Sequence, residues 1–151
     1  MKEKLLPFIL KFIALSLILF ALWHWKGEYY YFLFFNSIVP PLLRLFGIEL
    51  ILSPLLVPLF YNFLPFISLI LITRGLKPKE MLKKLSLGLF LIFLWQILLA
   101  EILFLIHTRI ENPASPAFAL YFILTLLNYS IPFALWLILA RKNLYTWFVP
   151  Q

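Results

Sequence analysis

Cysteine and aspartate are both missing from this chain of 151 residues, and histidine occurs only twice. Without cysteine the chain has no disulfides, no thiolate metal ligands and no cysteine nucleophile. Without aspartate, catalysis by a pair of aspartyl groups is excluded. The two histidines, His24 and His107, are too few for a histidine-rich metal site. We therefore expect neither a metal nor another cofactor.

Sequence motifs for catalysis are lacking as well. Only four glycines occur, and none of them forms a glycine-rich phosphate loop. Neither the G-x-S-x-G motif of serine hydrolases nor the H-E-x-x-H motif of zinc proteases is found. Ser53 and Ser68 lie in apolar surroundings without an obvious base. We assign no catalytic residue, and a non-enzymatic function is the leading hypothesis.

Apolar residues are abundant instead, at 64% of the chain, against about 45–50% in a typical soluble domain. A helix that crosses a bilayer core of about 30 Å needs about 20 apolar residues. Four stretches meet this requirement, at residues 5–25, 50–72, 85–106 and 118–140. The first lacks a cleavage site, so we expect it to be retained. The sequence predicts an all-α polytopic membrane protein with four transmembrane helices, in a single domain over residues 1–151.

Residues 29–47 are the ambiguous part of this topology. They are rich in tyrosine and phenylalanine, but Pro40 and Pro41 are expected to break any helix there. We interpret the segment as an interfacial or re-entrant hairpin on the outer face. The alternative is a fifth span at residues 29–46, which would invert the loops that follow.

The positive charges are distributed unevenly along the chain, whose net charge is +7. Ten of the 13 basic residues lie before or within the first span, in the loop 73–84 and after the last span. Only Lys26, Arg44 and Arg109 lie in the other connections. Basic loops are typical of the cytoplasmic side, so both termini are predicted to be cytoplasmic, in the cytoplasmic (inner) membrane. The bilayer explains the basic charge, and we expect no nucleic acid partner.

Three amide side chains fall near the middle of predicted spans: Asn62, Gln96 and Asn128. An unpaired amide in hydrocarbon is costly, so they should face the interior of the bundle. One interpretation is a set of hydrogen bonds that joins the helices. The other is a polar pocket at the midplane.

Charged and histidine side chains are expected at the outer ends of the spans. Glu101 is the one acidic residue inside a predicted span, and such a residue is a functional candidate. A cluster of Glu101 with His24, Arg44, His107 and Arg109 would suit general acid–base chemistry. The alternative is a structural ion pair between interfacial residues.

A family resemblance is carried by the stretches PLFYNFLPFISL at 58–69 and LSLGLFLIFLWQ at 85–96, with the basic loop between them. This succession resembles exosortase-associated small membrane proteins, and residues 40–47 are similar to the outer segment of that group. Exosortases are transpeptidases that use cysteine, arginine and histidine. Because this chain has no cysteine, the resemblance implies an accessory or degenerate member.

Three functional hypotheses follow. The first is an accessory protein that packs against another integral membrane protein through Gly88, Asn62 and Gln96. The second is a small carrier or binding subunit for a lipid or amphiphile, held between the proline-rich second span and the third and fourth spans. The third is a membrane enzyme that uses Glu101 and His107 at the outer face.

Overall fold

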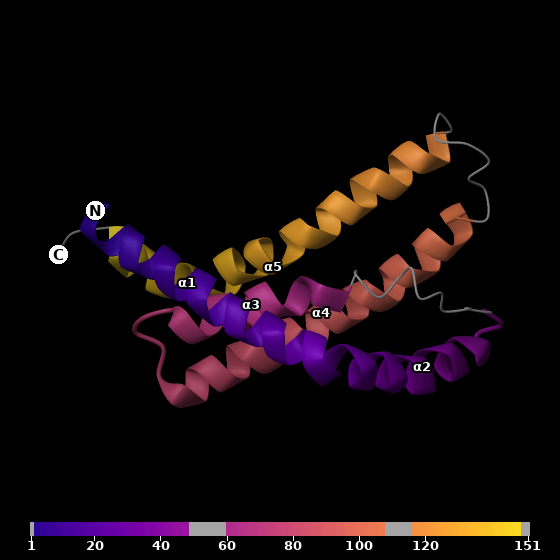
Figure 1. The fold of residues 1–151 in the computed structure, drawn as a ribbon, viewed down its shortest axis with the longest axis horizontal. Helices are drawn as coiled ribbons and strands as arrows, with labels where there is room; N and C mark the ends of the chain where they lie inside the picture. The colour runs from indigo at the N-terminus through magenta and orange to yellow at the C-terminus, as the bar shows by residue number, and fades with distance from the viewer. Residues whose placement is uncertain (1, 49–59, 108–115, 149–151) are drawn as a thin grey trace.

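The computed structural model of the protein describes residues 2–48, 60–107 and 116–148. Within these ranges all regular secondary structure is helical (Figure 1). Three helical segments are long and apolar enough to cross a membrane: Leu5–Arg44, Pro78–Ile106 and Pro116–Tyr145. A shorter apolar segment covers Phe60–Ile72. The prediction of an all-α, multi-pass membrane protein is confirmed.

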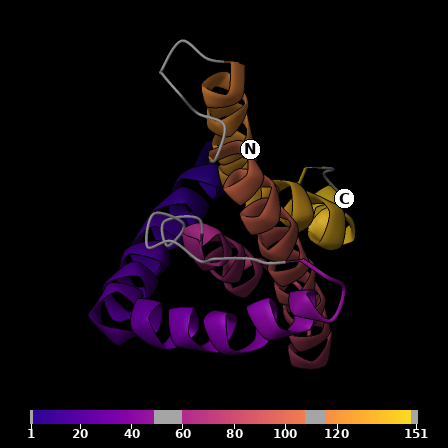
Figure 2. The same ribbon diagram turned by 90° about the vertical axis from the view of Figure 1, so that its right-hand side faces the viewer.

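Three helical pieces follow one another without a break near the amino terminus. They are α1 (Lys2–Leu22), the π-helical turn η1 (Trp23–Gly27) and α2 (Glu28–Arg44). In η1 the N–H of Glu28 donates to the carbonyl of Trp23, five residues earlier, instead of the four of an α-helix. Such a turn bends a helix, and Figure 2 shows α1 and α2 meeting at a sharp angle.

The hairpin predicted for residues 29–47 is wrong, because α2 continues through Pro40 and Pro41. The separate fifth span at 29–46 is not seen either, since α2 continues α1. Proline removes a backbone donor, so each of these two prolines costs the helix one hydrogen bond to the carbonyl four residues earlier. Val39 and Pro40 are buried, so packing stabilises the helix at this point.

Gly47, rather than a proline, ends this helix. Its φ of 74° lies in the left-handed region, which glycine adopts without strain. Its N–H donates to the carbonyl of Arg44, and the N–H of Ile48 donates to that of Leu43. These two bonds form a Schellman motif, the usual way in which a glycine terminates a helix.

A short buried helix, α3 (Phe63–Ile72), follows the helical turn at residues 60–62. It contacts α1, α4 and α5, and Figure 2 shows it inside a triangle outlined by α1, α2 and α4. Most of its apolar side chains are buried. The first part of the predicted second span, residues 50–59, lies outside the described residues.

The two longest uninterrupted α-helices are α4 (Pro78–His107) and α5 (Pro116–Phe148), which pack against each other. They contain the predicted spans 85–106 and 118–140. α4 also approaches α3 closely at Gly88, where an added Cβ would overlap the ring of Phe66. The core is formed mainly by side chains from α2, α3 and α4.

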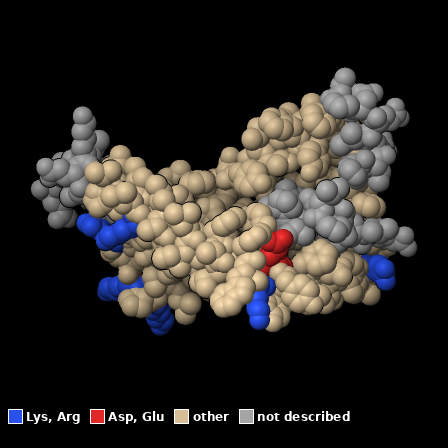
Figure 3. All heavy atoms as spheres, in the orientation of Figure 1, with Lys and Arg blue, Asp and Glu red and all other residues tan. Residues whose placement is uncertain are grey.

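The outer surface is apolar over long stretches, as expected of helices that face lipid. Leu6 and Leu17 of α1 and Ile138 of α5, for example, are mostly exposed. On the face drawn in Figure 3, Lys and Arg side chains gather toward the end that carries both termini. The turn between α3 and α4 lies at this same end (Figure 1).

Candidate functional site

The three amides predicted from the sequence meet in the interior. Asn62 precedes α3, Gln96 lies in the middle of α4 and Asn128 in the middle of α5, and each is at most 1% exposed. Nε2 of Gln96 donates to Oδ1 of Asn62 at 2.6 Å. Nδ2 of Asn62 donates to Oδ1 of Asn128 at 2.8 Å. The expectation that these amides face the bundle interior agrees with this geometry.

Two aromatic side chains that the sequence analysis did not single out extend this set of bonds. The hydroxyl of Tyr31 in α2 donates to Oε1 of Gln96. Nε1 of Trp95 donates to Oδ1 of Asn128 at 3.0 Å. The resulting amide chain, which we define as Tyr31, Gln96, Asn62, Asn128 and Trp95, joins α2, α3, α4 and α5. Interhelical hydrogen bonds in membranes contribute about 0.6–1.7 kcal/mol each, so the amide chain fixes how the helices pack.

The residues expected to face a partner protein make contacts within this chain instead. Asn62 and Gln96 bond to each other, and Gly88 is covered by the ring of Phe66. The hypothesis of an accessory protein stays a prediction, but these three residues do not offer it a surface.

The outer cluster is not assembled among the described residues. Arg44 lies at the end of α2, and His24 pairs with Glu28 instead of Glu101. Oε2 of Glu101 is buried and has no hydrogen-bond partner. The side chain of His107, and Arg109 as a whole, lie outside what the structure describes. Among the described residues, Glu101 is therefore not brought together with a histidine or arginine as the hypothesis of an enzyme site requires.

A different polar cluster lies at the bend between α1 and α2. Nδ1 of His24 lies 3.4 Å from Oε2 of Glu28, and the hydroxyl of Tyr61 donates to the same oxygen at 2.8 Å. Phe20 flanks both His24 and Tyr61. The spacing of four residues between His24 and Glu28 is a signal for such a pair on a helix, whereas the contact with Tyr61 depends on tertiary packing. The cluster ties the start of the α3 segment to the bend.

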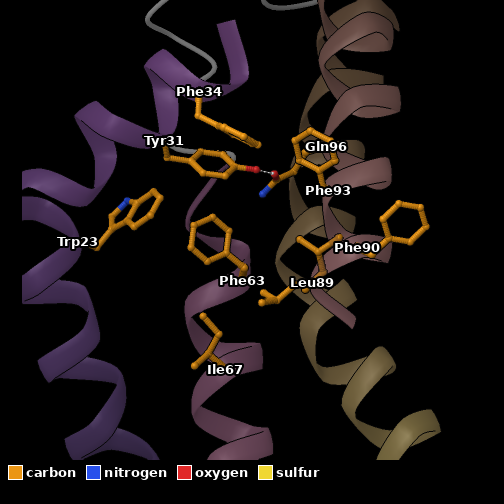
Figure 4. A pocket seen from close by; sticks show the side chains of 10 residues that line it. Trp23, Tyr31, Phe34, Phe63, Ile67, Leu89, Phe90, Phe93 and Gln96 are labelled. Carbon is orange, nitrogen blue, oxygen red and sulfur yellow. Dashed lines mark hydrogen bonds between the residues drawn. The ribbon is translucent and has the colours of Figure 1, made fainter. Parts of the chain in front are cut away.

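A pocket of about 400 Å³ opens between the bend, α3 and α4. Its floor contains Phe63, Ile92 and Gln96, which are buried, and its rim contains Phe34 and Phe90, which are 49% and 57% exposed. Figure 4 shows the Tyr31–Gln96 bond at one end and Ile67 at the other. The remaining wall residues are Trp23, Leu89 and Phe93.

The chemical character of the pocket follows from these side chains. None of the ten lining residues is charged, and six of them are aromatic. The polar groups that belong to its wall residues are the amide of Gln96, the hydroxyl of Tyr31 and the indole of Trp23. The lining contains no general acid–base pair or metal-binding set, and the described residues hold no group of three His, Cys, Asp or Glu suited to a metal. The pocket is equipped to bind an apolar body with a polar group.

Trp23 forms one wall of the pocket because of a nearby glycine. A Cβ on Gly27 would lie 2.7 Å from Cε3 of Trp23, so the indole lies against the backbone of the next turn. The indole is also in edge contact with Phe63, with ring centroids 4.5 Å apart. The spacing of Trp23, Gly27 and Tyr31, four residues apart along one helix face, is the sequence signal that could have indicated this wall.

No protein-family model, no curated protein and no solved structure matches this chain. The resemblance to exosortase-associated proteins therefore stays a prediction.

Proposed function

We propose that this protein binds an amphiphilic molecule of the bilayer in the pocket between α2, α3 and α4, as a binding or carrier subunit. The observation that carries the proposal is the pocket itself, with a buried floor, an exposed aromatic rim and the Tyr31–Gln96 pair at one end. Its volume of about 400 Å³ lies within the range of roughly 300–1,000 Å³ that is typical of ligand pockets.

The physical argument concerns what fills an open apolar pocket in a membrane. Water does not enter such a space, because its walls offer few hydrogen bonds. The amide chain opposes closure of the pocket, since Tyr31 and Gln96 hold α2 and α4 at a fixed separation. A lipid chain or another apolar molecule from the bilayer fills the space and regains the dispersion contacts that the walls would otherwise lose.

The protein is proposed to lie in the cytoplasmic membrane with both termini inside. The support is the uneven distribution of basic residues. Lys77, Lys79 and Lys83 near the α3–α4 turn are exposed, as are Arg141 and Lys142 near the carboxyl end. Lys84 Nζ donates to Oδ1 of Asn143 at 2.9 Å, so these two basic segments adjoin each other at one end of the molecule.

A role as the accessory subunit of another membrane protein, including an exosortase-type system, is the second candidate. The observation in its favour is the exposed aromatic surface of α2, where Tyr29 and Tyr30 are not covered by the rest of the chain. A partner would pack against this surface, because Asn62 and Gly88 are buried and Gln96 lies at the floor of the pocket.

The test of the binding function is to fill the pocket. Leu89 lines it, and Leu89→Trp replaces a wall side chain with a much larger one. Leu94→Trp makes the same change on the exposed side of α4, outside the lining. Wild type and the Leu94→Trp control should carry the same bound molecule in native mass spectrometry after mild purification. Leu89→Trp should lose it.

The experiment separates the two candidates as well. An identical set of bound molecules in all three proteins would contradict the binding function. A stoichiometric protein partner that is lost after substitution of Tyr29 and Tyr30, but kept in Leu89→Trp, would favour the accessory role. Circular dichroism and the unfolding temperature of each variant check that the fold is intact.

A further inference from the structure

We infer that the ligand of this pocket is a neutral amphiphile with a planar ring that carries carbonyl or hydroxyl oxygens, of the quinone or quinol class. The ring lies among the aromatic walls, and its oxygen faces the Tyr31–Gln96 pair. This inference rests on the proposed function, because it names the ligand class of the same pocket.

The charge of the ligand follows from the lining. All ten lining side chains are uncharged. A phosphate, carboxylate or ammonium group placed among them would leave water without gaining an opposite charge, which is strongly unfavourable. Glu28 and His24, the ionisable pair at the bend, are not in the lining, and Nδ1 of His24 lies 3.4 Å from Oε2 of Glu28. The ligand part inside the pocket is therefore neutral.

The shape of the ligand follows from the aromatic walls. The ring of Phe63 lies 4.5 Å from that of Trp23 and 5.1 Å from that of Tyr31, between centroids. Phe34 and Phe93 are in tilted contact at the pocket, with ring centroids 6.0 Å apart. Aromatic rings attract one another in edge and offset arrangements at these separations. A planar ring continues such packing, whereas a flexible acyl chain loses conformational entropy without this gain.

The polar group follows from a count of hydrogen-bond capacity. The hydroxyl of Tyr31 donates its one hydrogen to Gln96, so its oxygen is left as an acceptor. Nε2 of Gln96 donates one hydrogen to Asn62 and keeps a second one. The pair thus has one N–H donor for a carbonyl and an acceptor for a hydroxyl. Both the oxidised and the reduced form of a quinone match this capacity.

The experiment uses the full chain in phosphatidylcholine nanodiscs with three probes. They are a decyl-substituted benzoquinone, dodecanol as a neutral molecule without a ring, and dioleoylphosphatidylglycerol as a charged lipid. Saturable binding beyond partition into the nanodisc is measured for each. We expect the benzoquinone to bind and to lose this binding in Leu89→Trp. Ile67→Phe, a second pocket-filling variant, covers the case in which Leu89→Trp does not fold.

The contribution of the ring is tested with Phe63→Leu, which keeps an apolar wall but removes an aromatic one. We expect benzoquinone binding to weaken about fivefold, which corresponds to the loss of one aromatic–aromatic contact. The weak binding of dodecanol should stay unchanged. The matched control is Phe122→Leu, an exposed aromatic residue on α5 outside the lining, which should leave both affinities as in wild type.

The alternative outcomes overturn different statements. If dodecanol or phosphatidylglycerol binds in a manner that Leu89→Trp abolishes, and the benzoquinone does not compete, the quinone inference fails and the binding function remains. If neither pocket-filling variant alters the binding of any probe, both the inference and the proposed function fail.

Discussion

Asn62 stands at the centre of the amide chain, because both ends of its side chain are bonded. Its oxygen accepts from Gln96 and its nitrogen donates to Asn128. Leucine at this position would leave the Nε2 group of Gln96 buried without that acceptor. A buried polar group without a partner costs about 1–3 kcal/mol. We expect Asn62→Leu to lower the free energy of unfolding by this amount, measured by titration with sodium dodecyl sulfate.

Ser130→Ala is the matched control for this prediction. Ser130 lies two residues after Asn128, but its hydroxyl is exposed and bonds only to the carbonyl of Leu126 in its own helix. Its loss should change the stability by less than about 0.5 kcal/mol. Equal effects of the two substitutions would show that the amide chain does not stabilise the fold.

Single residues differ in how far the sequence identifies their role. Asn62, Gln96 and Asn128 are recognisable because an amide within an apolar run must find a partner. Tyr31 and Trp95 are not, since tyrosine and tryptophan are equally common at membrane interfaces. The place of Tyr31 in the amide chain depends on the bend at η1, which brings α2 beside the middle of α4. The place of Trp95 depends on the packing of α4 against α5.

At the scale of the helix, the end of α2 illustrates how two signals compete. The tandem prolines were expected to stop the helix, but it continues to Arg44 and ends in the motif formed by Gly47. Proline disfavours a helix by a local term of about 3 kcal/mol. Burial of Phe35 and Val39 in the same helix supplies an opposing term of about 1.5–3 kcal/mol for each side chain. The local cost of proline can be read from the sequence, whereas the gain from burial depends on the tertiary packing.

The close contact between α3 and α4 gives a prediction about helix packing. Alanine in place of Gly88 would put its Cβ within the ring of Phe66, whose side chain is completely buried. Because a packed core does not yield freely, such overpacking costs about 1–3 kcal/mol. We expect Gly88→Ala to lower the unfolding temperature, whereas Ser86→Ala, on the exposed side of the same helix, should leave it nearly unchanged.

The double variant Gly88→Ala with Phe66→Leu tests whether the ring is the cause. Phe66→Leu alone destabilises by leaving a cavity, but in the double variant the methyl group added by Gly88→Ala occupies part of that space. The destabilisation of the double variant should be smaller than the sum of the two single effects, by at least about 0.5 kcal/mol. Strict additivity would mean that Gly88 is required for another reason.

For the whole molecule, the depth of the bend decides how the chain crosses the membrane. The predicted first span ends at residue 25, which would put the bend at the outer surface. In the structure, Tyr31 bonds to Gln96, and Tyr61 next to Asn62 bonds to Glu28. These contacts put the bend beside the middle of α4 and α5. Two arrangements follow: either α1 and α2 together form one bent span from Lys2 to Arg44, with the exposed Lys26 inside the hydrocarbon, or α1 alone crosses the bilayer and the bend, with Lys26, lies at the outer surface.

The lack of cysteine makes the two arrangements directly testable. A single introduced cysteine is the only thiol in the chain, so a membrane-impermeant maleimide reports its position without background labelling. Leu45→Cys, 80% exposed just after α2, should be labelled from outside in intact cells. Leu82→Cys, exposed near the start of α4, should be labelled only after the cells are opened.

Trp25→Cys distinguishes the two topologies. Trp25 is 78% exposed on the surface of the protein, so only lipid can shield it from the reagent. In a single bent span it lies within the hydrocarbon and should stay unlabelled both in intact and in opened cells. If it is instead labelled from outside as readily as Leu45→Cys, the bend lies at the outer surface. The parts of α4 and α5 on the outer side of Gln96 and Asn128 would then project from the bilayer, although they are as apolar as the parts on the cytoplasmic side.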